Sequence, residues 1–256
     1  MGLVIGFTKP RNPILGMIFA GEIESKGNEV NRFNIGDQVY GTTIGNAFTM
    51  RFGTYAEYKC LPENSVMDFK PNNLTLEESA AIPYGGLIAL HFLKKGNIQN
   101  GSKVLIYGAS GSIGTSAVQI SKSFNARVTG VCSSTNLDLV RSLGAEDVID
   151  YTKDEASNKL EQYDFILDAV GKKKTSRLKT QSKDALTPNG KYISVDDGSP
   201  KETLENLNLL TKLVEAGLLR PVIDQTFPLE QMVEAHRYVE TGHKKGNVVI
   251  TVVHNQ

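Results

Sequence analysis

The chain has 256 residues, enough for one large domain or two modest ones with real cores. Its 28 basic and 28 acidic residues balance, and no basic run carries interleaved aromatic residues. Nothing therefore indicates binding to nucleic acid or to an anionic membrane surface. No apolar stretch approaches the length of a membrane span, and Lys9, Pro10, Arg11 and Pro13 make the start unlike a secretory signal. We expect a cytoplasmic protein with a small-molecule substrate and with neither nucleic acid nor a membrane as partner.

Cysteine and histidine do not form a metal-binding pattern in this chain. Cys60 and Cys132 are far apart, without a CxxC motif or a nearby histidine, and we expect both to be small buried hydrophobic residues. The histidines have no ligand-like partner three to five residues away, and structural or solvated roles are favoured for all four: His91, His236, His243 and His254. The sequence thus predicts no metal site.

The first third of the chain has two kinds of pattern. Residues 14–60 contain short alternating runs punctuated by glycine, which are typical of a small barrel-like β domain. Residues 73–92 have a helical pattern that starts with a capping box, in which Thr75 caps and Glu78 reaches back. The run PYGG at 83–86 is expected to break this helix, and its two glycines fit part of a cleft or a simple bend equally well.

A glycine turn at 108–114 follows the apolar, branched run KVLIY at 103–107, which predicts a strand buried on both faces. Gly108 would allow a tight turn, Gly111 would let the backbone approach a pyrophosphate, and Gly114 would let a helix lie close to the sheet. Amide groups at the helix start would then point at the anion. An ordinary strand-to-helix turn remains the alternative, because a glycine triplet alone is a weak signal.

Strand and helix patterns alternate after residue 101, which predicts a parallel, doubly wound α/β sheet. A further strand is expected after the turn PNG at 188–190, followed by an amphipathic segment that ends at Gly217. In chain order the expected elements are helix 113–124, strand 127–131, helix 136–143, strand 147–150, helix 153–161, strand 164–168, strand 192–195 and the amphipathic segment 202–216.

The end of the second strand bears on the choice of coenzyme. An enzyme that uses NAD usually has a carboxylate there for the ribose 2′-hydroxyl. This chain has the run CSSTN at 132–136, whose hydroxyl groups accept a 2′-phosphate without like-charge repulsion. The run therefore favours NADPH, with NADH and a plain polar turn as the alternatives.

Several motifs in order resemble the medium-chain dehydrogenase/reductase superfamily, in its zinc-free quinone oxidoreductase-like branch. They are PILGMIFAGEIESKGNEVNRFNIGDQVYG, FGTYAEY, ESAAIPYGGLIALHFL, GASGSIG, SLGAEDVIDY and HKKGNVVITV. The resemblance implies a Rossmann-type doubly wound parallel sheet plus a partial GroES-like β-barrel domain. We expect the β-rich substrate domain at 1–84 and 220–256 and the dinucleotide-binding domain at 85–219.

The resemblance also implies a function. We expect a zinc-independent, NADPH-dependent oxidoreductase that transfers hydride to a quinone, an enone or a similar activated carbonyl compound. Zinc-dependent members carry a His-Glu pair just after the glycine that aligns with Gly16, where this chain has Met17 and Ile18. The sequence has no recognisable Ser-His-Asp or Cys-His arrangement, so no catalytic residue is assigned.

The expected coenzyme contacts follow from the glycine turn and from the resemblance. Ser133 and Tyr151 would bind the adenosine end, Val170 and Gly171 would lie near the nicotinamide ribose, and Asn247, next to Gly246, would close over the coenzyme. Asp168 fits a buried helix cap, and the lysines at 172–174 fit a solvated helix start. The pyrophosphate would lie among Gly108, Ser110, Gly111, Ser112, Ile113 and Gly114.

Departures from the family pattern favour a second interpretation, a catalytically impaired NADPH-binding module. The family's first strands have no counterpart here, which would leave Ile18, Ile23 and Val39 without cover. Ile88 replaces a threonine common beside the nicotinamide, and no basic residue follows the second strand. The stretch 194–220 is short for the extra strand that often pairs subunits, so a homodimer is left open.

A short-chain dehydrogenase needs a Tyr-x-x-x-Lys pair on a helix after the glycine motif. Tyr55 and Lys59 have this spacing, but they precede the motif and lie in FGTYAEYKCLPE, whose alternation predicts a strand. The sequence therefore argues against that class.

Overall fold

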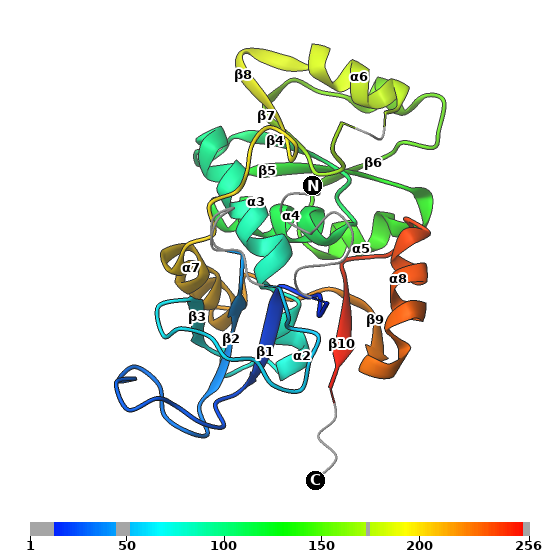
Figure 1. Ribbon diagram of the computed structural model, residues 1–256. Coiled ribbons are helices and arrows are strands. Elements are labelled where there is room, and N and C mark those ends of the chain that lie inside the picture. The colour runs from blue at the N-terminus through cyan, green and yellow to red at the C-terminus, as the bar shows by residue number, and fades with distance from the viewer. Residues whose placement is uncertain (1–12, 45–51, 173–174, 253–256) are drawn as a thin grey trace.

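The computed structural model describes residues 13–44, 52–172 and 175–252. These residues form two parts (Figure 1). A five-stranded sheet with helices on both faces occupies the upper half of the view, and two smaller sheets occupy the lower half.

The five-stranded sheet is parallel throughout and has the order β6-β5-β4-β7-β8. The chain therefore begins at the central strand, adds strands on one side, and then crosses to the other. This reversal between β4 and β7 defines a doubly wound sheet and confirms the predicted architecture. The strands are β4 (Lys103–Tyr107), β5 (Arg127–Cys132), β6 (Asp147–Asp150), β7 (Tyr163–Asp168) and β8 (Leu186–Ser194).

Alternating side chains of β4 enter two separate cores, because successive residues of a strand point to opposite faces. Val104 and Ile106 belong to the larger core with α3, α4 and α7, whereas Leu105 and Tyr107 belong to a smaller one with α6. A strand covered on both faces has no polar side, which explains the apolar run. The helices are α3 (Pro83–Gly96), α4 (Ser112–Ser123), α5 (Leu137–Ser142), α6 (Arg177–Asp184) and α7 (Leu204–Glu215), with 3-10 turns at Ser134–Asn136 and Ala156–Lys159.

The helical stretch predicted at 73–92 is broken, as expected, at residues 81–82. The run PYGG does not lie in this break, however, but begins the second helix. The capping box at Thr75 is present and starts the short helix α2 (Leu76–Ala80). Pro83 then opens α3, where a missing amide hydrogen costs nothing. A Cβ on Gly85 would lie 2.3 Å from the carbonyl oxygen of Ser112, and one on Gly86 would lie 2.8 Å from Leu210. The two glycines therefore serve close helix packing.

Three other expected elements differ. The predicted helix at 153–161 shrinks to the 3-10 turn Ala156–Lys159, in which Ala156 alone is buried and gives a longer helix little to pack. The strand predicted at 192–195 begins earlier, at Leu186, and carries the PNG run within it beside a register shift. The described residues 52–60 form no strand.

The lower part contains an antiparallel sheet of order β1-β2-β3 and a parallel pair of β9 and β10. Phe33, Val39 and Met67 form its own small core. Val39 is only 4% exposed, so the expectation that it lacks cover is wrong, while Ile18 and Ile23 are half-buried. The elements are β1 (Ile18–Glu22), β2 (Gln38–Thr42), β3 (Val66–Phe69), β9 (Ile223–Pro228), a 3-10 turn Leu229–Gln231, α8 (Met232–Glu240) and β10 (Asn247–Thr251).

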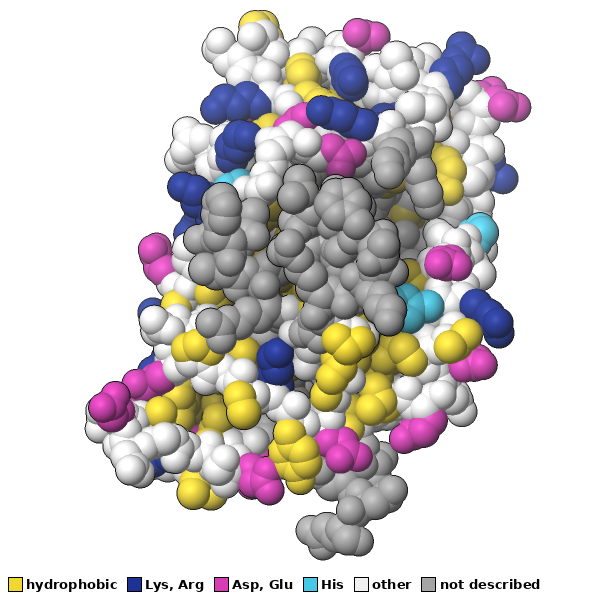
Figure 2. Space-filling view, in the orientation of Figure 1, with side chains coloured by type: hydrophobic (Ala, Val, Ile, Leu, Met, Phe, Trp, Pro, Cys, Tyr) yellow, Lys and Arg dark blue, Asp and Glu magenta, His cyan; other side chains and the backbone are white. Residues whose placement is uncertain are grey.

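Figure 2 shows hydrophobic side chains gathered in the lower half of the visible face, around β1 and β10. Ile14 and Leu15, just before β1, are among the exposed large hydrophobic residues. Along the described parts of the chain, no helix is both long and apolar enough to cross a membrane.

Strand β2 joins the two parts. The hydroxyl of Tyr40 lies 2.8 Å from the Thr211 hydroxyl in α7, and the Thr42 side chain forms a hydrogen bond with Glu202, just before α7. Glu202 is only 8% exposed, and one of its carboxyl oxygens has no partner among the described residues. Burial raises the pKa of this carboxyl from 4.5 to about 7, against the opposite effect of the Thr42 contact.

The free energy of unfolding should therefore depend on the Glu202 proton. Because the pKa of Glu202 is higher in the folded state than in the unfolded state, the protonated carboxyl contributes to the free energy of unfolding. This contribution is complete below pH 4.5 and is lost as the pH rises through about 7. The loss is on the order of 3 kcal/mol. Glu202→Gln should remove it, so the variant should gain stability over the wild type between pH 5 and pH 8 in urea unfolding. The exposed Glu205→Gln is the control, and identical pH profiles for Glu202→Gln and the wild type would contradict the prediction.

Candidate coenzyme-binding site

The turn after β4 is fixed by backbone contacts. Gly108 has φ +83°, and a Cβ there would lie 2.4 Å from Cγ2 of Val170. The amides of Gly108 and Ala109 donate to the carbonyl of Val131, at 3.0 and 2.9 Å. Only glycine fits position 108, since both the backbone conformation and the neighbouring loop exclude a side chain.

Helix α4 begins in direct contact with this turn. A Cβ on Gly114 would lie 2.1 Å from the Gly108 carbonyl oxygen and 2.7 Å from Cα of Ala109. The helix therefore starts at backbone distance from the sheet edge, and its first amides open at the carboxyl end of β4.

Gly111 is different, because nothing within the described chain requires glycine there. It is the N-cap of α4, in an extended conformation (φ −82°, ψ 178°) that any residue adopts. A Cβ would have only the Gly108 carbonyl oxygen within 4 Å among the described residues, at an ordinary 3.6 Å. The N-cap also has no side chain to accept hydrogen bonds from the amides of Ser112, Ile113 and Gly114. Gly111 also forms a parallel β-bridge with Gly246, so the chain's C-terminal segment lies beside this helix start. Among the described residues, the room at the Gly111 Cβ position and the positive end of the helix fit an anionic ligand such as a pyrophosphate.

The C-terminal part of the chain crosses the same turn. The Gly246 amide donates to the Ser110 carbonyl at 2.8 Å, and the Ser112 hydroxyl donates to Oδ1 of Asn247 at 2.5 Å. The Asn247 amide is itself held by the Val222 carbonyl at 2.8 Å. Residues more than 130 positions apart in sequence thus meet at the start of α4, where the resemblance places Asn247.

At the end of β5 an asparagine links two predicted coenzyme contacts. Nδ2 of Asn136 donates to the hydroxyls of Ser110, at 3.2 Å, and Ser133, at 3.1 Å. Asn136 is 7% exposed, and its Oδ1 has no partner among the described residues. A buried amide oxygen without a partner is costly, which makes it a natural acceptor for a ligand hydroxyl. The sequence showed Asn136 only as a member of a polar run, and no pattern marked it as buried.

The same end of the sheet carries a buried carboxylate. Asp150 accepts hydrogen bonds from the Ser134 hydroxyl at 2.6 Å and the Thr152 hydroxyl at 2.7 Å. Burial raises the pKa of Asp150, but these hydrogen bonds outweigh it and hold the pKa below the usual value. Tyr151, 46% exposed, lies beside it with its ring centroid 6.4 Å from that of Tyr107. Cys132 lies opposite Asp150 on the adjacent strand β5 and is buried. Burial, and to a lesser degree the charge of Asp150, raise the pKa of the Cys132 thiol to about 11.

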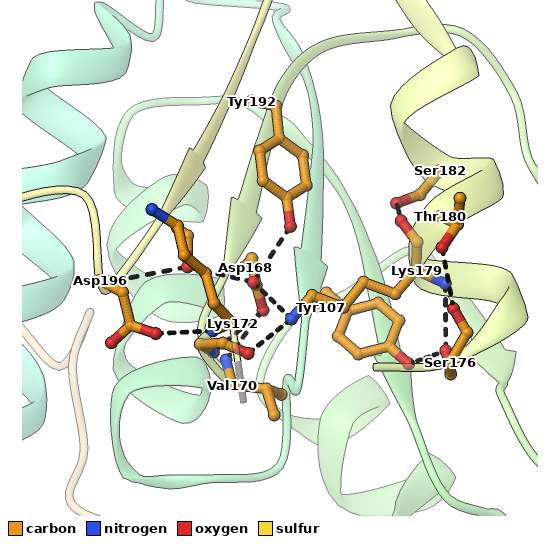
Figure 3. Close-up of polar contacts among 12 residues, drawn as sticks. Tyr107, Asp168, Val170, Lys172, Ser176, Lys179, Thr180, Ser182, Tyr192 and Asp196 are labelled. Atoms are coloured by element: carbon orange, nitrogen blue, oxygen red, sulfur yellow. Dashed lines mark hydrogen bonds and ion pairs between the residues drawn. The ribbon is translucent and has the colours of Figure 1, made fainter. Parts of the chain in front are cut away.

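The end of β7 positions the loop expected at the nicotinamide ribose. Asp168 is fully buried and accepts hydrogen bonds from the amides of Val170 and Gly171. The sequence had suggested that Asp168 caps a helix, and this prediction is wrong, because the two amides belong to a loop. Lys172 does not start a helix either. Its amide donates to Asp196 (Figure 3), and its ammonium pairs with Asp197. The lysines at 173 and 174 lie outside the described residues.

Several smaller predictions were also resolved. Cys60 is exposed, so the expectation that both cysteines are buried is wrong for it. Ile88 lies on α3 and belongs to the larger hydrophobic core. His236 and His243 are exposed and His91 is half-buried, whereas His254 lies outside the described residues. Among residues 13–44, 52–172 and 175–252, no three His, Cys, Asp or Glu side chains form a group that could hold a metal ion.

A doubly wound parallel sheet with a glycine turn between β4 and α4, joined to small β sheets, is the architecture of nicotinamide-dependent oxidoreductases. Sequence families agree. An alcohol dehydrogenase GroES-like domain matches residues 3–71, and zinc-binding dehydrogenase domains match residues 112–216 and 197–250. These matches bear out the GroES-like part of the predicted fold.

Individual relatives narrow the class. A mitochondrial NAD(P)H oxidoreductase of Bos taurus is 34% identical, over 93% of this chain and 70% of its own length. The 2-methylene-furan-3-one reductase of Solanum lycopersicum is 32% identical, over 94% of this chain and 64% of its own. The quinone oxidoreductase from Coxiella burnetii superposes with a TM-score of 0.79 at 29% identity, over 95% of this chain and 81% of that one. The chain belongs to the medium-chain dehydrogenase/reductase superfamily, in its quinone oxidoreductase-like branch.

Gly111→Val tests the glycine turn. The variant should fold, because the backbone at 111 accommodates a β-branched residue and its Cβ has room. Its isopropyl group would fill the space over the α4 amides, so the Kd for NADPH in calorimetry should rise by about two orders of magnitude. Gly21→Val in β1, where a Cβ meets nothing within 4 Å among the described residues, is the matched control. Unchanged affinity in Gly111→Val would refute the site.

Proposed function

We propose that this chain is a zinc-independent reductase that uses NADPH to reduce a quinone, an enone or a similar activated carbonyl compound. The observation that carries the proposal is Gly111, a glycine that neither the backbone nor the packing demands, at the open start of α4. The proposal is further supported by relatives named as NAD(P)H oxidoreductases, as an NADPH-dependent alkenal/one oxidoreductase and as quinone oxidoreductases.

The residues divide the work of binding and orienting. The amides of 112–114 would bind the pyrophosphate, while Ser110 and Asn247 hold the crossing segment in place. Val170 and Gly171, fixed by Asp168, would form the wall beside the nicotinamide ribose. A bound reduced nicotinamide supplies the hydride, so the chain needs no nucleophile of its own. Its contribution would be to hold the donor and acceptor carbons at short, oriented range.

The adenosine end favours NADPH over NADH. The end of β5 presents the Ser133 hydroxyl and the Asn136 carboxamide, neither of which repels a phosphate. The buried carboxylate at the same end of the sheet, Asp150, accepts hydrogen bonds from Ser134 and Thr152 and is 6% exposed. NADH, whose ribose hydroxyl could donate to Oδ1 of Asn136, remains the weaker alternative.

Zinc independence is proposed from the donor chemistry. The positions after Gly16 hold a thioether and a branched alkyl group, Met17 and Ile18, where a zinc-dependent relative has an imidazole and a carboxylate. Catalytic zinc needs three N, O or S ligands from the protein, and these two side chains supply none of the usual ones.

Two further expectations belong to this proposal. We propose a cytoplasmic protein with a small-molecule substrate and without nucleic acid or membrane partners, although some relatives carry mitochondrial or chloroplastic names. A homodimer is compatible with β8 at the edge of the described sheet, which leaves one row of backbone groups for pairing.

The direct test is coenzyme binding followed by turnover. NADPH should bind, and a series of quinones and enones should drive its oxidation, measured by loss of nicotinamide absorbance. Dialysis against a chelator should leave the rate unchanged, and a loss restored by zinc would contradict zinc independence. Binding without oxidation of any acceptor would favour the impaired NADPH-binding module, to which Ile88 points because it supplies no hydroxyl. Absence of binding by either coenzyme would overturn the proposal as a whole.

Asn136→Asp tests the choice of coenzyme. A carboxylate at this position would lie between the Ser110 and Ser133 hydroxyls and would repel a 2′-phosphate. The Kd for NADPH should rise by about tenfold or more, while that for NADH stays within a few-fold, which makes NADH the internal control. An unchanged ratio of the two dissociation constants would show that Asn136 does not face the ribose 2′ position.

A further inference from the structure

A buried ion pair lies at the carboxyl end of β7. Nζ of Lys179 in α6 is 2.6 Å from Oδ2 of Asp168, and the two side chains are 7% and 0% exposed. The pair is found where the strand order reverses, with β4 on one side of β7 and β8 on the other (Figure 3). In doubly wound sheets this crevice outside the strand ends is where ligands bind.

The carboxylate of Asp168 is saturated with donors. Besides Lys179, Oδ2 accepts from the Tyr192 hydroxyl at 3.0 Å and the Ser194 hydroxyl at 3.1 Å. Oδ1 accepts from the amides of Val170 and Gly171, at 3.1 and 3.2 Å. Such a set stabilises the charged carboxylate at a fixed place and ties the loop after β7 to it.

Lys179 also contacts the loop after β7 directly. Its ammonium also donates to the Gly171 carbonyl, at 2.6 Å. The pair therefore holds Gly171 on both sides, the amide through Asp168 and the carbonyl through Lys179, in a left-handed conformation with φ +85°. Val170 in the same loop packs against Gly108, with its Cγ2 only 2.4 Å from where a Cβ of residue 108 would be.

The stability of the fold gives no sufficient reason for such a pair. Removing two charges from water costs about as much as their attraction returns, so apolar residues of similar volume would serve the core equally well. What the pair provides is a single, rigid position for the segment 169–171. That position lies in the crevice, whereas the adenosine end is organised by a separate network of Ser110, Asn136 and Ser133.

We propose that Lys179 and Asp168 are positioning residues for the nicotinamide half of the coenzyme and make no contribution to binding its adenosine half. The inference rests on the proposed function. It divides the groove into two independently held parts: the Lys179–Asp168 pair fixes the wall beside the nicotinamide ribose, and the hydroxyl and amide network at the end of β5 binds the adenosine end.

The proposed division between the nicotinamide and adenosine halves is tested by measuring how the Lys179→Met variant binds two different ligands. Calorimetry should give a Kd for NADPH raised by about tenfold or more, because the 169–171 wall loses one of its two holds. The Kd for adenosine 2′-phosphate 5′-diphosphate, which lacks the nicotinamide half, should stay within about twofold. With a quinone acceptor, kcat at saturating NADPH should also fall, since an ill-placed ring transfers hydride slowly. Lys179→Arg keeps the charge and should recover part of both losses.

Two further variants guard against a simple folding defect. Lys179→Met leaves Asp168 buried without its cation, so the double variant Asp168→Asn/Lys179→Met, which removes both charges, is measured in parallel. Lys122→Met breaks an ion pair with Glu146 at the surface and is the matched control, expected to bind both ligands like the wild type. Thermal unfolding of each variant is recorded first.

The outcomes separate clearly. Equal weakening of NADPH and of the adenosine fragment would overturn the inference, and so would NADPH binding at wild-type strength in a folded Lys179→Met or double variant. If neither Lys179→Met nor the double variant folds, the inference is also contradicted, because the ion pair would then be required for folding. If the wild type binds the adenosine fragment but not NADPH, or binds neither, the proposed function fails before the variants are considered.

Discussion

The close approach of α4 to the end of β4 is the constraint on which the rest of the site depends. Gly114 lets the helix begin against the Gly108 carbonyl, and Gly85 lets α3 press on the backbone of Ser112. The Gly246 amide then reaches the Ser110 carbonyl from the far end of the chain. Three distant segments thus meet at one helix start: two pack closely because glycine has no side chain at the contact, and the third is joined by a backbone hydrogen bond.

Two different kinds of interaction hold the chain at the carboxyl ends of the neighbouring strands. At the end of β5, hydroxyl and carboxamide groups of Ser110, Ser133 and Asn136 hold one another through single neutral hydrogen bonds. At the end of β7, a buried ion pair fixes the loop instead. Neutral groups can change partner when a phosphate or hydroxyl arrives, whereas the buried pair permits one arrangement. Under the proposed function, the adaptable end would face the part of the coenzyme that differs between NADH and NADPH, and the rigid end would face the part where chemistry needs exact placement.

Much of the fold was predictable because its signals are local. The apolar run at 103–107 and the alternation after it predicted the doubly wound sheet, and the capping box at Thr75 predicted the start of α2. Predictions failed where a residue has two meanings that only packing separates. The PYGG run suggested a break, but it opens α3, because Pro83 suits a first turn and the glycines meet other helices. The polar stretch at 153–161 has helical spacing but buries almost nothing, so only a 3-10 turn forms.

The amino-acid order alone determined the strand-and-helix alternation, the glycine turn and the family, since these follow from neighbours a few residues apart. The tertiary structure alone decided that Asn136 is buried with an oxygen that has no partner among the described residues, that Lys179 in α6 pairs with Asp168, and that Asn247 meets Ser112. Asn136 meets Ser110 across 26 positions and Asn247 meets Ser112 across 135, and Lys179 reaches Asp168 from a separate element. No local pattern encodes such contacts, because they arise only when the strands have paired and the helices have packed.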